Sequence, residues 1–272
     1  MWLLALFYAL KVRLTYSEYR PQPVRYKTLI NWLNQYDRSD WWLLLKLLNG
    51  IEYISEDQTR QYLIQRNTSL LNKLKSVGVK KENTIYISFG DAGSSSAAML
   101  NLLRDAALLE KTNCKLFDYK NILEIQETTN ELGNGAIIFV DDFIGSGDQF
   151  IEARNFISEF IPQNFSQFIL SVCICEEALE PLAKLGIQPL AGKIHTRVDR
   201  PLHLMGSKIP DSEKNRLLHL SKRLGPRGAL GYREMASNVV LYRNSPNTLP
   251  RILRGSKTQR PFVGIIPKTT DL

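Results

Sequence analysis

Residues 136–149 read AIIFVDDFIGSGDQ, an apolar run followed by two aspartates and a loop of small residues. Four bulky apolar residues in succession, from Ile137 to Val140, favour a strand that is buried on both faces of a parallel sheet. Asp141 and Asp142 then fall at the C-terminal end of that strand. Ligands bind at this edge of open α/β sheets, so the two carboxylates are predicted to belong to a functional site.

Segments with the patterns of strands and helices alternate on both sides of this stretch. The predicted strands besides 136–140 are 84–89, 113–119, 166–175 and 188–195. Helical patterns occupy 97–111, 148–161 and 176–186, whereas the polar segment 120–134 is predicted to be an irregular connection. This alternation predicts an α/β fold in which helices cover both faces of a parallel sheet.

Three segments are expected along the chain. Residues 1–80 carry apolar residues three or four apart and are predicted to be an N-terminal helical segment, and residues 81–195 form the α/β core. Residues 196–272 are expected to fold over the sheet as a basic C-terminal cap that completes the domain. The first 12 residues, MWLLALFYALKV, have no preceding basic residue and are shorter than the roughly 20 residues that span a bilayer. They are therefore predicted to be a helix buried against the body of the protein or against a partner chain, with no membrane span. Interfacial membrane contact through Trp2 and Phe7 is the less favoured alternative.

Composition is that of a soluble globular protein. The chain has 272 residues, of which 44% are hydrophobic and 23% charged, enough to bury one good core. Its three cysteines form no CxxC pair and are odd in number, which favours a reducing compartment, the cytoplasm. His195, His203 and His219 match no usual spacing of metal ligands, so surface or structural roles are expected for them.

The positive charge is concentrated in the last third of the chain. Net charge is +8, but residues 193–272 contain 16 Lys/Arg against 5 Asp/Glu, so this part carries +11 and the rest −3. Such asymmetry fits a surface for the phosphates of a nucleotide or a nucleic acid, and equally a solvated basic face without a ligand. Arg197, Arg200 and Lys208 are the candidate contacts to a phosphate or a base.

Two loops of small residues each lie between a predicted strand and a predicted helix. They are SFGDAGSSSAA at 88–98 and GSGDQ at 145–149. Unpaired backbone N–H groups at a helix start suit an anion such as phosphate, and glycine allows a close approach. Asp141 and Asp142 suit sugar hydroxyls or a divalent cation. A Walker B role would need a GxxxxGK[ST] loop, which the sequence does not contain.

The stretch IIFVDDFIGSGDQ resembles the ribose-phosphate signature of the type I phosphoribosyltransferases, and SFGDAGSSSAA stands where that family has its pyrophosphate loop. The resemblance covers about 84–195. It implies displacement of pyrophosphate at the anomeric carbon of a phosphorylated ribose or nucleotide, a glycosyltransferase reaction assisted by Mg²⁺. The implied roles are ribose-hydroxyl contact, with Mg²⁺, for Asp141 and Asp142; 5′-phosphate contact for Gly145, Ser146, Gly147, Asp148 and Gln149; and pyrophosphate contact for Gly90, Asp91, Ala92, Gly93 and Ser94.

Two further segments are similar to the phosphoribosyltransferase-like effectors of bacterial antiphage and conflict systems. They are residues 30–55, INWLNQYDRSDWWLLLKLLNGIEYIS, and residues 231–250, GYREMASNVVLYRNSPNTLP. Some members of that group accompany reverse transcriptases in retrons. The resemblance therefore implies a toxic effector that a complex of reverse transcriptase with RNA and DNA holds in check.

Three residues depart from the pattern of active phosphoribosyltransferases. Asp91 stands in a loop that often carries a basic residue, Asp148 lies in the phosphate loop, and Gln149 replaces a common threonine. Acids beside phosphates are unfavourable unless they point away or bind a metal. Two alternatives therefore stay open beside the transferase: a noncatalytic sensor that binds a phosphoribosyl group or nucleotide, and a structural subunit that binds nucleic acid through the basic third.

Overall fold

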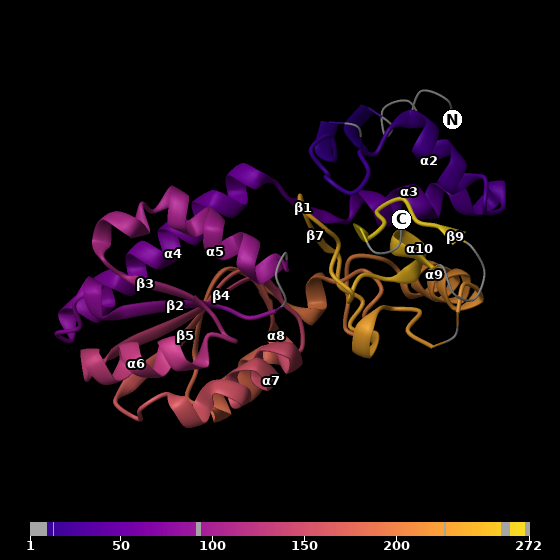
Figure 1. Cartoon of the computed structure of the whole chain (residues 1–272). Coiled ribbons are helices and arrows are strands. Elements are labelled where there is room, and N and C mark those ends of the chain that lie inside the picture. Colours follow the sequence, from indigo (N-terminus) through magenta and orange to yellow (C-terminus); the bar gives the residue numbers. More distant parts are fainter. Residues whose placement is uncertain (1–9, 13, 91–93, 226, 257–261, 270–272) are drawn as a thin grey trace. The chain divides into compact units, whose positions relative to one another are not determined.

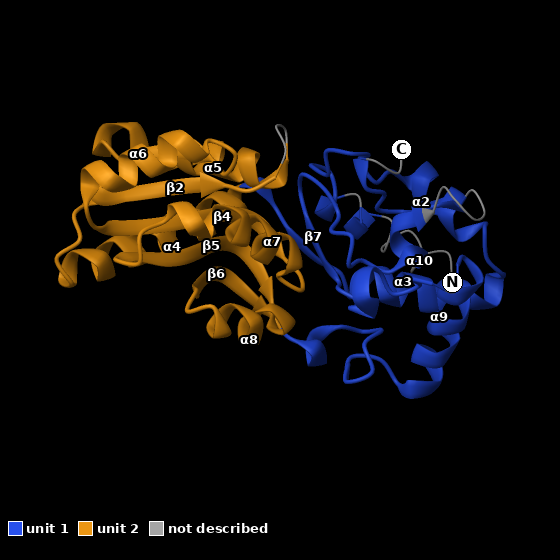
Figure 2. Cartoon of the chain, turned by 60° about the horizontal axis from the view of Figure 1, so that its bottom comes forward, with its two compact units in different colours: residues 1–56, 196–272 blue, residues 57–195 orange. Residues whose placement is uncertain are grey.

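The computed structural model describes residues 10–12, 14–90, 94–225, 227–256 and 262–269. The chain divides into two compact units, which Figure 2 shows in different colours. We call residues 57–195 unit 2, and residues 1–56 together with 196–272 unit 1. The two ends of the chain thus belong to the same unit. The division into the segments 1–80, 81–195 and 196–272 stays a prediction.

Unit 2 is built on a five-stranded sheet in which every neighbouring pair of strands is parallel. The spatial order is β3-β2-β4-β5-β6. The strands are β2 (Thr84–Ser88), β3 (Lys115–Asp118), β4 (Gly135–Ile144), β5 (Phe165–Cys175) and β6 (Gln188–His195). The parallel α/β fold predicted from the sequence is therefore confirmed. The central strand β4 contains the apolar run Ile137–Val140.

Helices cover both faces of this sheet, as Figure 1 shows. On one face lie α4 (Glu56–Ser76) and α5 (Ser95–Ala106), and on the other lie α6 (Ile122–Leu132), α7 (Asp148–Ile157) and α8 (Glu176–Lys184). Both faces of β4 are consequently dry, which explains why its sequence is continuously apolar instead of alternating.

Alternate residues of the strands pack against the two helical layers. Ile87 and Phe139 belong to the core that also contains Phe150 of α7, and the Phe139 and Phe150 rings meet edge to face with centroids 5.0 Å apart. On the opposite face, the Tyr86 hydroxyl donates a 2.8 Å hydrogen bond to Asn67 Oδ1 of α4. These contacts fix the position of β2 and β4 and of the loops that follow them.

The prediction of an irregular connection at 120–134 is wrong, because residues 122–132 form α6. The helix buries only Ile125 and Thr129 completely, since it covers the sheet near its edge strand β3. A helix with so little buried apolar surface leaves a weak periodic pattern in the sequence.

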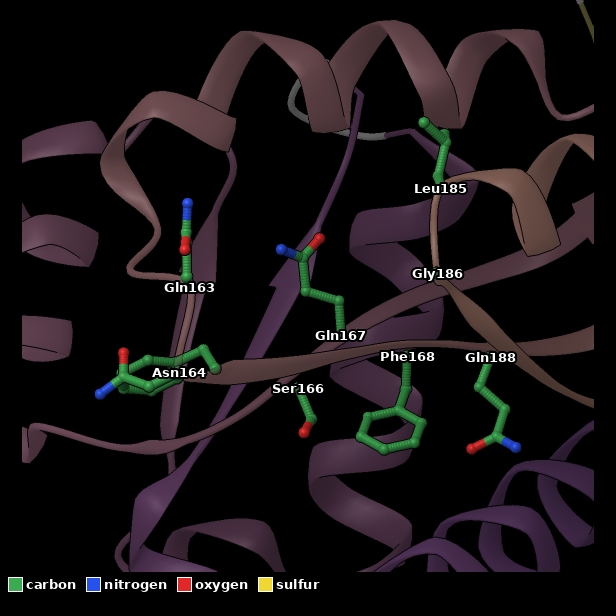
Figure 3. Close-up of a pocket in the computed structure, with 9 residues that line it drawn as sticks. Gln163, Asn164, Ser166, Gln167, Phe168, Leu185, Gly186 and Gln188 are labelled. Atoms are coloured by element: carbon green, nitrogen blue, oxygen red, sulfur yellow. The ribbon is translucent and has the colours of Figure 1, made fainter.

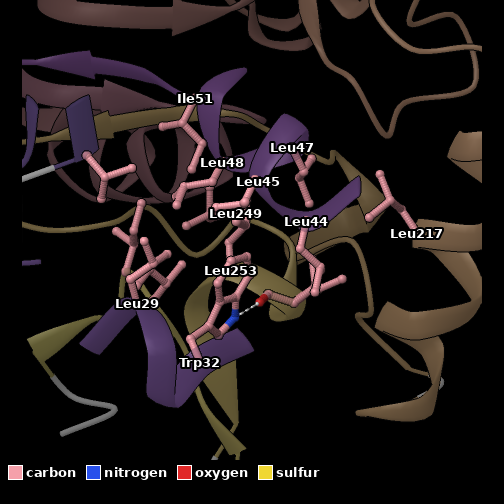
Figure 4. Close-up of a cluster of buried hydrophobic side chains, with 14 of the residues drawn as sticks. Leu29, Trp32, Leu44, Leu45, Leu47, Leu48, Ile51, Leu217, Leu249 and Leu253 are labelled. Atoms are coloured by element: carbon pink, nitrogen blue, oxygen red, sulfur yellow. Dashed lines mark hydrogen bonds between the residues drawn. The ribbon is translucent and has the colours of Figure 1, made fainter. Parts of the chain in front are cut away.

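Unit 1 has helices from both ends of the chain. They are α2 (Tyr26–Leu33), α3 (Trp41–Asn49), α9 (Asp211–Arg223) and α10 (Arg251–Arg254). Their apolar side chains share one core, shown in Figure 4. There Trp32 of α2 is buried and its Nε1 donates a 2.9 Å hydrogen bond to the Ile252 carbonyl of α10. The early helices and the basic last third therefore fold together.

Short strands complete unit 1. The pair β1 (Glu52–Ile54) and β7 (Val239–Leu241) is parallel, and β8 (Gly255–Ser256) is antiparallel to β9 (Phe262–Val263). Of the predicted N-terminal helix, residues 1–9 lie outside the described residues, and the side chain of Val12 is buried in the core of unit 1. Among the described helices, none has the length and apolar character that crossing a bilayer requires. Short 3-10 turns occupy Arg38–Asp40, Lys81–Asn83, Leu109–Thr112, Ser158–Phe160, Arg197–Asp199 and Tyr232–Glu234.

Candidate functional site

Strand β4 extends beyond its neighbour β2 at the carboxyl edge of the sheet. Pairing between them ends where Val140 lies opposite Ser88, whereas pairing of β4 with β5 continues to Ile144 opposite Ile174. The sequence had placed the end of the strand at Val140, before the aspartates. In the structure Asp141 and Asp142 lie inside β4. They lie where β4 no longer pairs with β2 but still pairs with β5.

The strand order of the sheet reverses between β2 and β4, at the same place. From β2 the chain moves outward to the edge strand β3, then crosses back to β4 on the other side of β2. The loops that leave β2 and β4 consequently run to α5 and α7 on opposite faces of the sheet (Figure 1). Open α/β sheets bind their ligands in the crevice at such a topological switch point.

The two aspartates are almost completely buried at this edge, with 5% and 7% of their surfaces exposed for Asp141 and Asp142. Asp141 Oδ1 accepts a 3.0 Å hydrogen bond from Ser95 Oγ, at the start of α5, and a 2.9 Å hydrogen bond from the backbone N–H of Asp142. The carboxylate of Asp141 is therefore held in place from two sides. Ser95 was not among the residues singled out in the sequence.

Burial raises the pKa of Asp141 well above its ordinary value, and the neighbouring charge of Asp142 raises it further. The hydrogen bonds from Asp142 N–H and Ser95 act in the opposite direction, because they stabilise the charged form. Two carboxyl groups this close in a dry site cannot both carry full negative charge without a compensating cation or donor. The pair is thus suited to a cation or to the hydroxyls of a sugar.

The first loop is bound to the strands through consecutive serines. Ser94 caps α5 by accepting a 3.3 Å hydrogen bond from Ala97 N–H. Ser96 Oγ donates a 2.5 Å hydrogen bond to the Val140 carbonyl and accepts a 2.7 Å hydrogen bond from Phe89 N–H. The start of α5 is thereby fixed beside the end of β4. Of the predicted pyrophosphate loop, Asp91, Ala92 and Gly93 lie outside the described residues.

The second loop leads from β4 into the first turn of α7. Gly147 adopts φ +86° immediately before the helix, in the left-handed region that favours glycine. Ser146 Oγ donates a 2.6 Å hydrogen bond to Asp148 Oδ2, so this acid is engaged within its own loop. Gly145 follows Ile144 directly. The Asp148 N–H donates a 3.4 Å hydrogen bond to Ser146 Oγ. The first turn of a helix generally directs N–H groups toward an anion.

The two loops approach each other through Gly90 and Gln149. A Cβ built on Gly90, where φ is +135°, lies 3.9 Å from Gln149 Nε2 and 2.9 Å from Ser94 Cβ and Oγ. Gly90 and Ser94 therefore come close to Gln149, which lies 55 positions beyond Ser94 in the sequence. The structure thus brings Gly90 and Ser94 close to Gln149 and Ser95 to Asp141, whereas the roles of the predicted site residues in binding stay predictions.

The three basic candidates belong to unit 1. Arg200 is fully buried there and its Nη1 donates a 3.0 Å hydrogen bond to the Met235 carbonyl. Lys208 Nζ lies 3.3 Å from Asp199 Oδ1. Arg197 is partly buried in a 3-10 turn. Contact of these residues with a phosphate or a base stays a prediction.

A pocket of about 370 Å³ in unit 2 lies at the opposite edge of the sheet (Figure 3). It is formed where β5 and β6 begin, and its polar side chains include Asn164, Gln167 and Gln188. No lining residue of this pocket is titratable. Its position and chemistry separate it from the aspartate pair, which remains the candidate site.

The donor set of the site fits Mg²⁺. Carboxylate oxygens are the ligands that Mg²⁺ prefers, and the ion usually takes one or two of them and completes its shell with water and substrate oxygens. Asp141 and Asp142 supply two carboxylates on consecutive residues. Within the described residues no group of three or more His, Cys, Asp or Glu could hold a metal by itself. The geometry thus fits a shared ion better than a cage made by the protein alone.

A family model described as PRTase-CE matches residues 29–268. The search of curated proteins gave no match. Among solved structures, HGPRT-ase from Leishmania tarentolae in complex with GMP shares 12% identity over 53% of this chain and 81% of that chain, with a TM-score of 0.37.

Two further solved structures are similar to the chain at a comparable level. A hypothetical protein from Neisseria gonorrhoeae with bound ppGpp shares 14% identity over 62% of this chain and 97% of that chain, with a TM-score of 0.35. Purine phosphoribosyltransferase from Pyrococcus horikoshii Ot3 shares 13% identity over 53% of this chain and 86% of that chain, with a TM-score of 0.30.

Proposed function

The chain belongs to the PRTase-CE family, and from this premise we propose that unit 2 binds a 5-phosphoribosyl group and transfers it. The protein then acts in the cytoplasm as a phosphoribosyltransferase-like effector of an antiphage defence system of the retron type. One observation carries the proposal: the buried Asp141 and Asp142 lie at the switch point of a parallel sheet, between two loops that each enter a helix.

The ribose ring lies over the aspartate pair in this proposal. The 2′- and 3′-hydroxyls donate hydrogen bonds to Asp141 and Asp142, and the hydroxyl donors offset the charge repulsion that raises the pKa of Asp141. Mg²⁺, when bound by the two carboxylates and the ligand oxygens, supplies positive charge next to the leaving pyrophosphate. The 5′-phosphate accepts hydrogen bonds from backbone N–H groups of residues 145–149 at the start of α7.

The transfer itself needs positioning and charge more than a nucleophile of the protein. The bond between the anomeric carbon and the pyrophosphate oxygen breaks, positive charge develops on the ribose, and an acceptor atom of the second substrate forms the new bond. Carboxylates near the ring stabilise that positive charge in the transition state. Ser95 holds Asp141 in one orientation during this step, because its hydroxyl donates to Oδ1 over 3.0 Å.

A partner complex of reverse transcriptase with RNA and DNA holds the effector in check in this proposal, and release makes it toxic. Support comes from the resemblance of residues 30–55 and 231–250 to such effectors and from the +11 charge of residues 193–272. A basic surface of this kind suits the phosphates of a nucleic acid.

A second candidate function is a noncatalytic sensor of the same ligand. It is favoured by Asp148, whose carboxylate accepts the Ser146 hydroxyl over 2.6 Å and adds negative charge to the predicted phosphate loop. Such a loop binds a phosphate less tightly than one without an acid. The sensor binds the phosphoribosyl ligand and releases no pyrophosphate.

Calorimetric titration of the purified chain with 5-phosphoribosyl 1-diphosphate, with and without Mg²⁺, tests the ligand. We expect binding that requires Mg²⁺ and that is lost in Asp141→Asn/Asp142→Asn. The matched control is Asp105→Asn, which removes an exposed carboxylate from α5. Binding that is equal in the wild type and the double variant contradicts the proposed site.

Pyrophosphate release in the presence of nucleobases and cell RNA then separates the transferase from the sensor. Growth after induced expression tests the effector role, with the double variant as the comparison. Toxicity that disappears in the double variant, together with one altered nucleotide or RNA species, supports the transferase. Toxicity that is equal in both assigns the effect to another part of the chain.

A further inference from the structure

A pocket in unit 1 has a lining that is unusually rich in arginine. It has a volume of about 350 Å³, and Arg233, Arg251 and Arg254 contribute to its wall together with a single acid, Glu234. Guanidinium groups stay protonated in proteins, so the pocket gathers three permanent positive charges against one negative charge.

Two of the arginines are positioned by close backbone contacts. A Cβ built on Gly228 would lie 3.6 Å from Arg251 Nη2, so the guanidinium group rests against a glycine. Arg251 Nη1 is buried and has no hydrogen-bond partner among the residues that the structure describes. Arg254 Nη1 donates a 3.2 Å hydrogen bond to the Asn247 carbonyl. The fork of Arg251 therefore lies beside Gly228 with its Nη1 enclosed by protein, and the Asn247 carbonyl orients Arg254.

The loop beside these arginines has a strained backbone. Arg233, Glu234 and Ala236 have φ values of 52°, 52° and 50°, in the left-handed region that is unfavourable for a non-glycine residue. Such strain persists only where the surrounding structure enforces it, and it clusters at ligand sites. A loop that keeps three residues in this conformation is a candidate for a functional constraint.

Contacts with a second loop enforce this conformation. Gly231 lies so close to Thr248 that an added Cβ would be 2.3 Å from the Thr248 carbonyl oxygen. The same oxygen accepts a 3.0 Å hydrogen bond from Ser237 N–H, and the Leu230 carbonyl accepts one of 2.8 Å from Ala236 N–H. The pocket is consequently preorganised, which lowers the entropic cost of binding a ligand.

We propose that this pocket binds the phosphate group of a nucleotide, with the base against Tyr232. Arg251 and Arg254 present planar guanidinium donors, the geometry that matches phosphate oxygens. Tyr232 lines the same pocket with 45% of its surface exposed, and Arg233 Cζ lies 5.8 Å from its ring centroid. Exposed aromatic rings beside arginines stack nucleobases irrespective of their identity.

The ligand chemistry, a phosphate attached to a nucleoside, comes either from a free nucleotide or from the 5′ end of a single-stranded RNA. All residues of the proposed site belong to unit 1, whereas Asp141 and Asp142 belong to unit 2. The inference therefore does not rest on the proposed transferase, and the experiment can test the two sites separately.

The test titrates the full chain, in the Asp141→Asn/Asp142→Asn background, with AMP, adenosine, inorganic phosphate, and a short single-stranded RNA with or without a 5′-phosphate. Arg251→Gln and Arg254→Gln are each compared with Arg223→Gln, an exposed arginine of α9 that does not line the pocket. Thermal unfolding of every variant verifies that it is folded.

We expect AMP or the 5′-phosphorylated RNA to bind, and each pocket variant to lose about tenfold or more in affinity, the loss that one charge-assisted hydrogen bond accounts for. Arg223→Gln binds as its parent does. Tighter binding of the phosphorylated RNA than of AMP identifies an RNA end as the source, and equal binding identifies a free nucleotide. The inference is overturned if inorganic phosphate binds as tightly as AMP, or if neither AMP nor the RNA binds. It is also overturned if folded Arg251→Gln and Arg254→Gln keep the affinity of their parent.

Discussion

Ser95 Oγ donates a hydrogen bond to Asp141 Oδ1 over 3.0 Å, and this bond connects the first turn of α5 to the carboxyl edge of β4. Its neighbours in the sequence have other partners. Ser94 accepts from Ala97 N–H as a helix cap, and Ser96 bridges Phe89 N–H and the Val140 carbonyl. Three consecutive serines thus have three separate tasks: capping, orienting an acid and joining two strands.

Alanine at each serine should separate these tasks. Ser94→Ala loses a cap and is expected to lower the free energy of unfolding by about 1 kcal/mol. Ser96→Ala removes the acceptor of the buried Phe89 N–H and should cost about 1–3 kcal/mol. Ser95→Ala should change stability least and ligand affinity most, by about tenfold, because its bond is to a charged acceptor. Denaturant unfolding and calorimetric titration measure the two quantities.

The same series has a second readout. Ser95 lowers the pKa of Asp141, so Ser95→Ala should raise that pKa further and move the pH midpoint of Mg²⁺-dependent binding upward. Ser94→Ala should leave the midpoint where it is. An unchanged midpoint in Ser95→Ala means that the hydroxyl does not influence the carboxyl group in solution.

Asp141 should make the protein without Mg²⁺ less stable as pH rises. Its pKa in the folded state is raised, chiefly by burial, above the value near 3.9 of an unfolded chain. Its contribution to stability is then fully present below about pH 4 and is lost as pH rises through the raised pKa. Asp141→Asn should remove this loss. With a chelator present, the melting temperature of Asp141→Asn should exceed that of the wild type at high pH. The difference between the two melting temperatures should become smaller as the pH falls.

Exposed Asp105 provides the comparison for this experiment, since Asp105→Asn removes a carboxylate of the same unit that solvent screens. We expect its melting temperature to follow that of the wild type across the whole pH range. Parallel curves for Asp141→Asn and wild type contradict the raised pKa.

Mg²⁺ should stabilise the wild type more at neutral pH than in acid. A metal ion requires deprotonated carboxylates, so it competes with the proton that the raised pKa of Asp141 retains. At pH values above the raised pKa of Asp141, addition of Mg²⁺ should therefore raise the melting temperature, and a chelator should reverse the effect. Asp141→Asn/Asp142→Asn should show neither change, whereas an equal response in this variant means that the ion binds elsewhere.

The carboxylate of Asp148 should oppose phosphate binding in the second loop. Asp148→Asn removes a negative charge from the first turn of α7, which is expected to cost about 0.3–1 kcal/mol of stability. It also weakens the hold on the Ser146 hydroxyl, which is then free to donate to a phosphate. We therefore expect tighter binding of ribose 5-phosphate in the variant, measured by titration. Weaker binding would mean that Asp148 takes part in ligand recognition.

The sheet was predictable because burial leaves a clear mark on a sequence. The apolar runs at Ile85–Ile87 and Ile137–Val140 are covered by helices on both sides, so their composition alone identifies them as central strands. The end of β4 was placed too early, because two aspartates interrupt the apolar run. Pairing with β5 extends the strand to Ile144, and pairing between strands cannot be read from one segment.

Two other features of the fold, helix α6 and the pairing of β1 with β7, leave no clear pattern in the local sequence. Helix α6 buries only Ile125 and Thr129 completely, too little to mark a helical face in a polar segment. The pairing of β1 with β7 joins segments of three residues that are almost 190 positions apart, Glu52 opposite Val239. Such contacts depend on the tertiary fold. The glycines and serines of its loops pointed to the candidate site, but Ser95 was missed because serines also serve as ordinary helix caps.

Gly147→Ala should weaken ligand binding beyond its effect on stability, and Gly78→Ala is its matched control. The two glycines have nearly equal φ values, +86° and +84°. A Cβ at Gly147 makes an ordinary contact with Ala178 at 3.5 Å, and one at Gly78 meets nothing within 4 Å. Both substitutions therefore carry the same backbone cost, about 1–2 kcal/mol, without a steric clash.

Only Gly147 lies at the start of α7, where the N–H groups predicted to bind the 5′-phosphate are positioned. Relaxation of its strained φ should turn those groups away, so we expect Gly147→Ala to bind ribose 5-phosphate about tenfold more weakly, the loss of one charge-assisted hydrogen bond. Gly78→Ala, which is equally destabilised, should retain the affinity of the wild type. If the two variants lose the same affinity, the effect arises from stability and the loop at 145–149 is not the phosphate site.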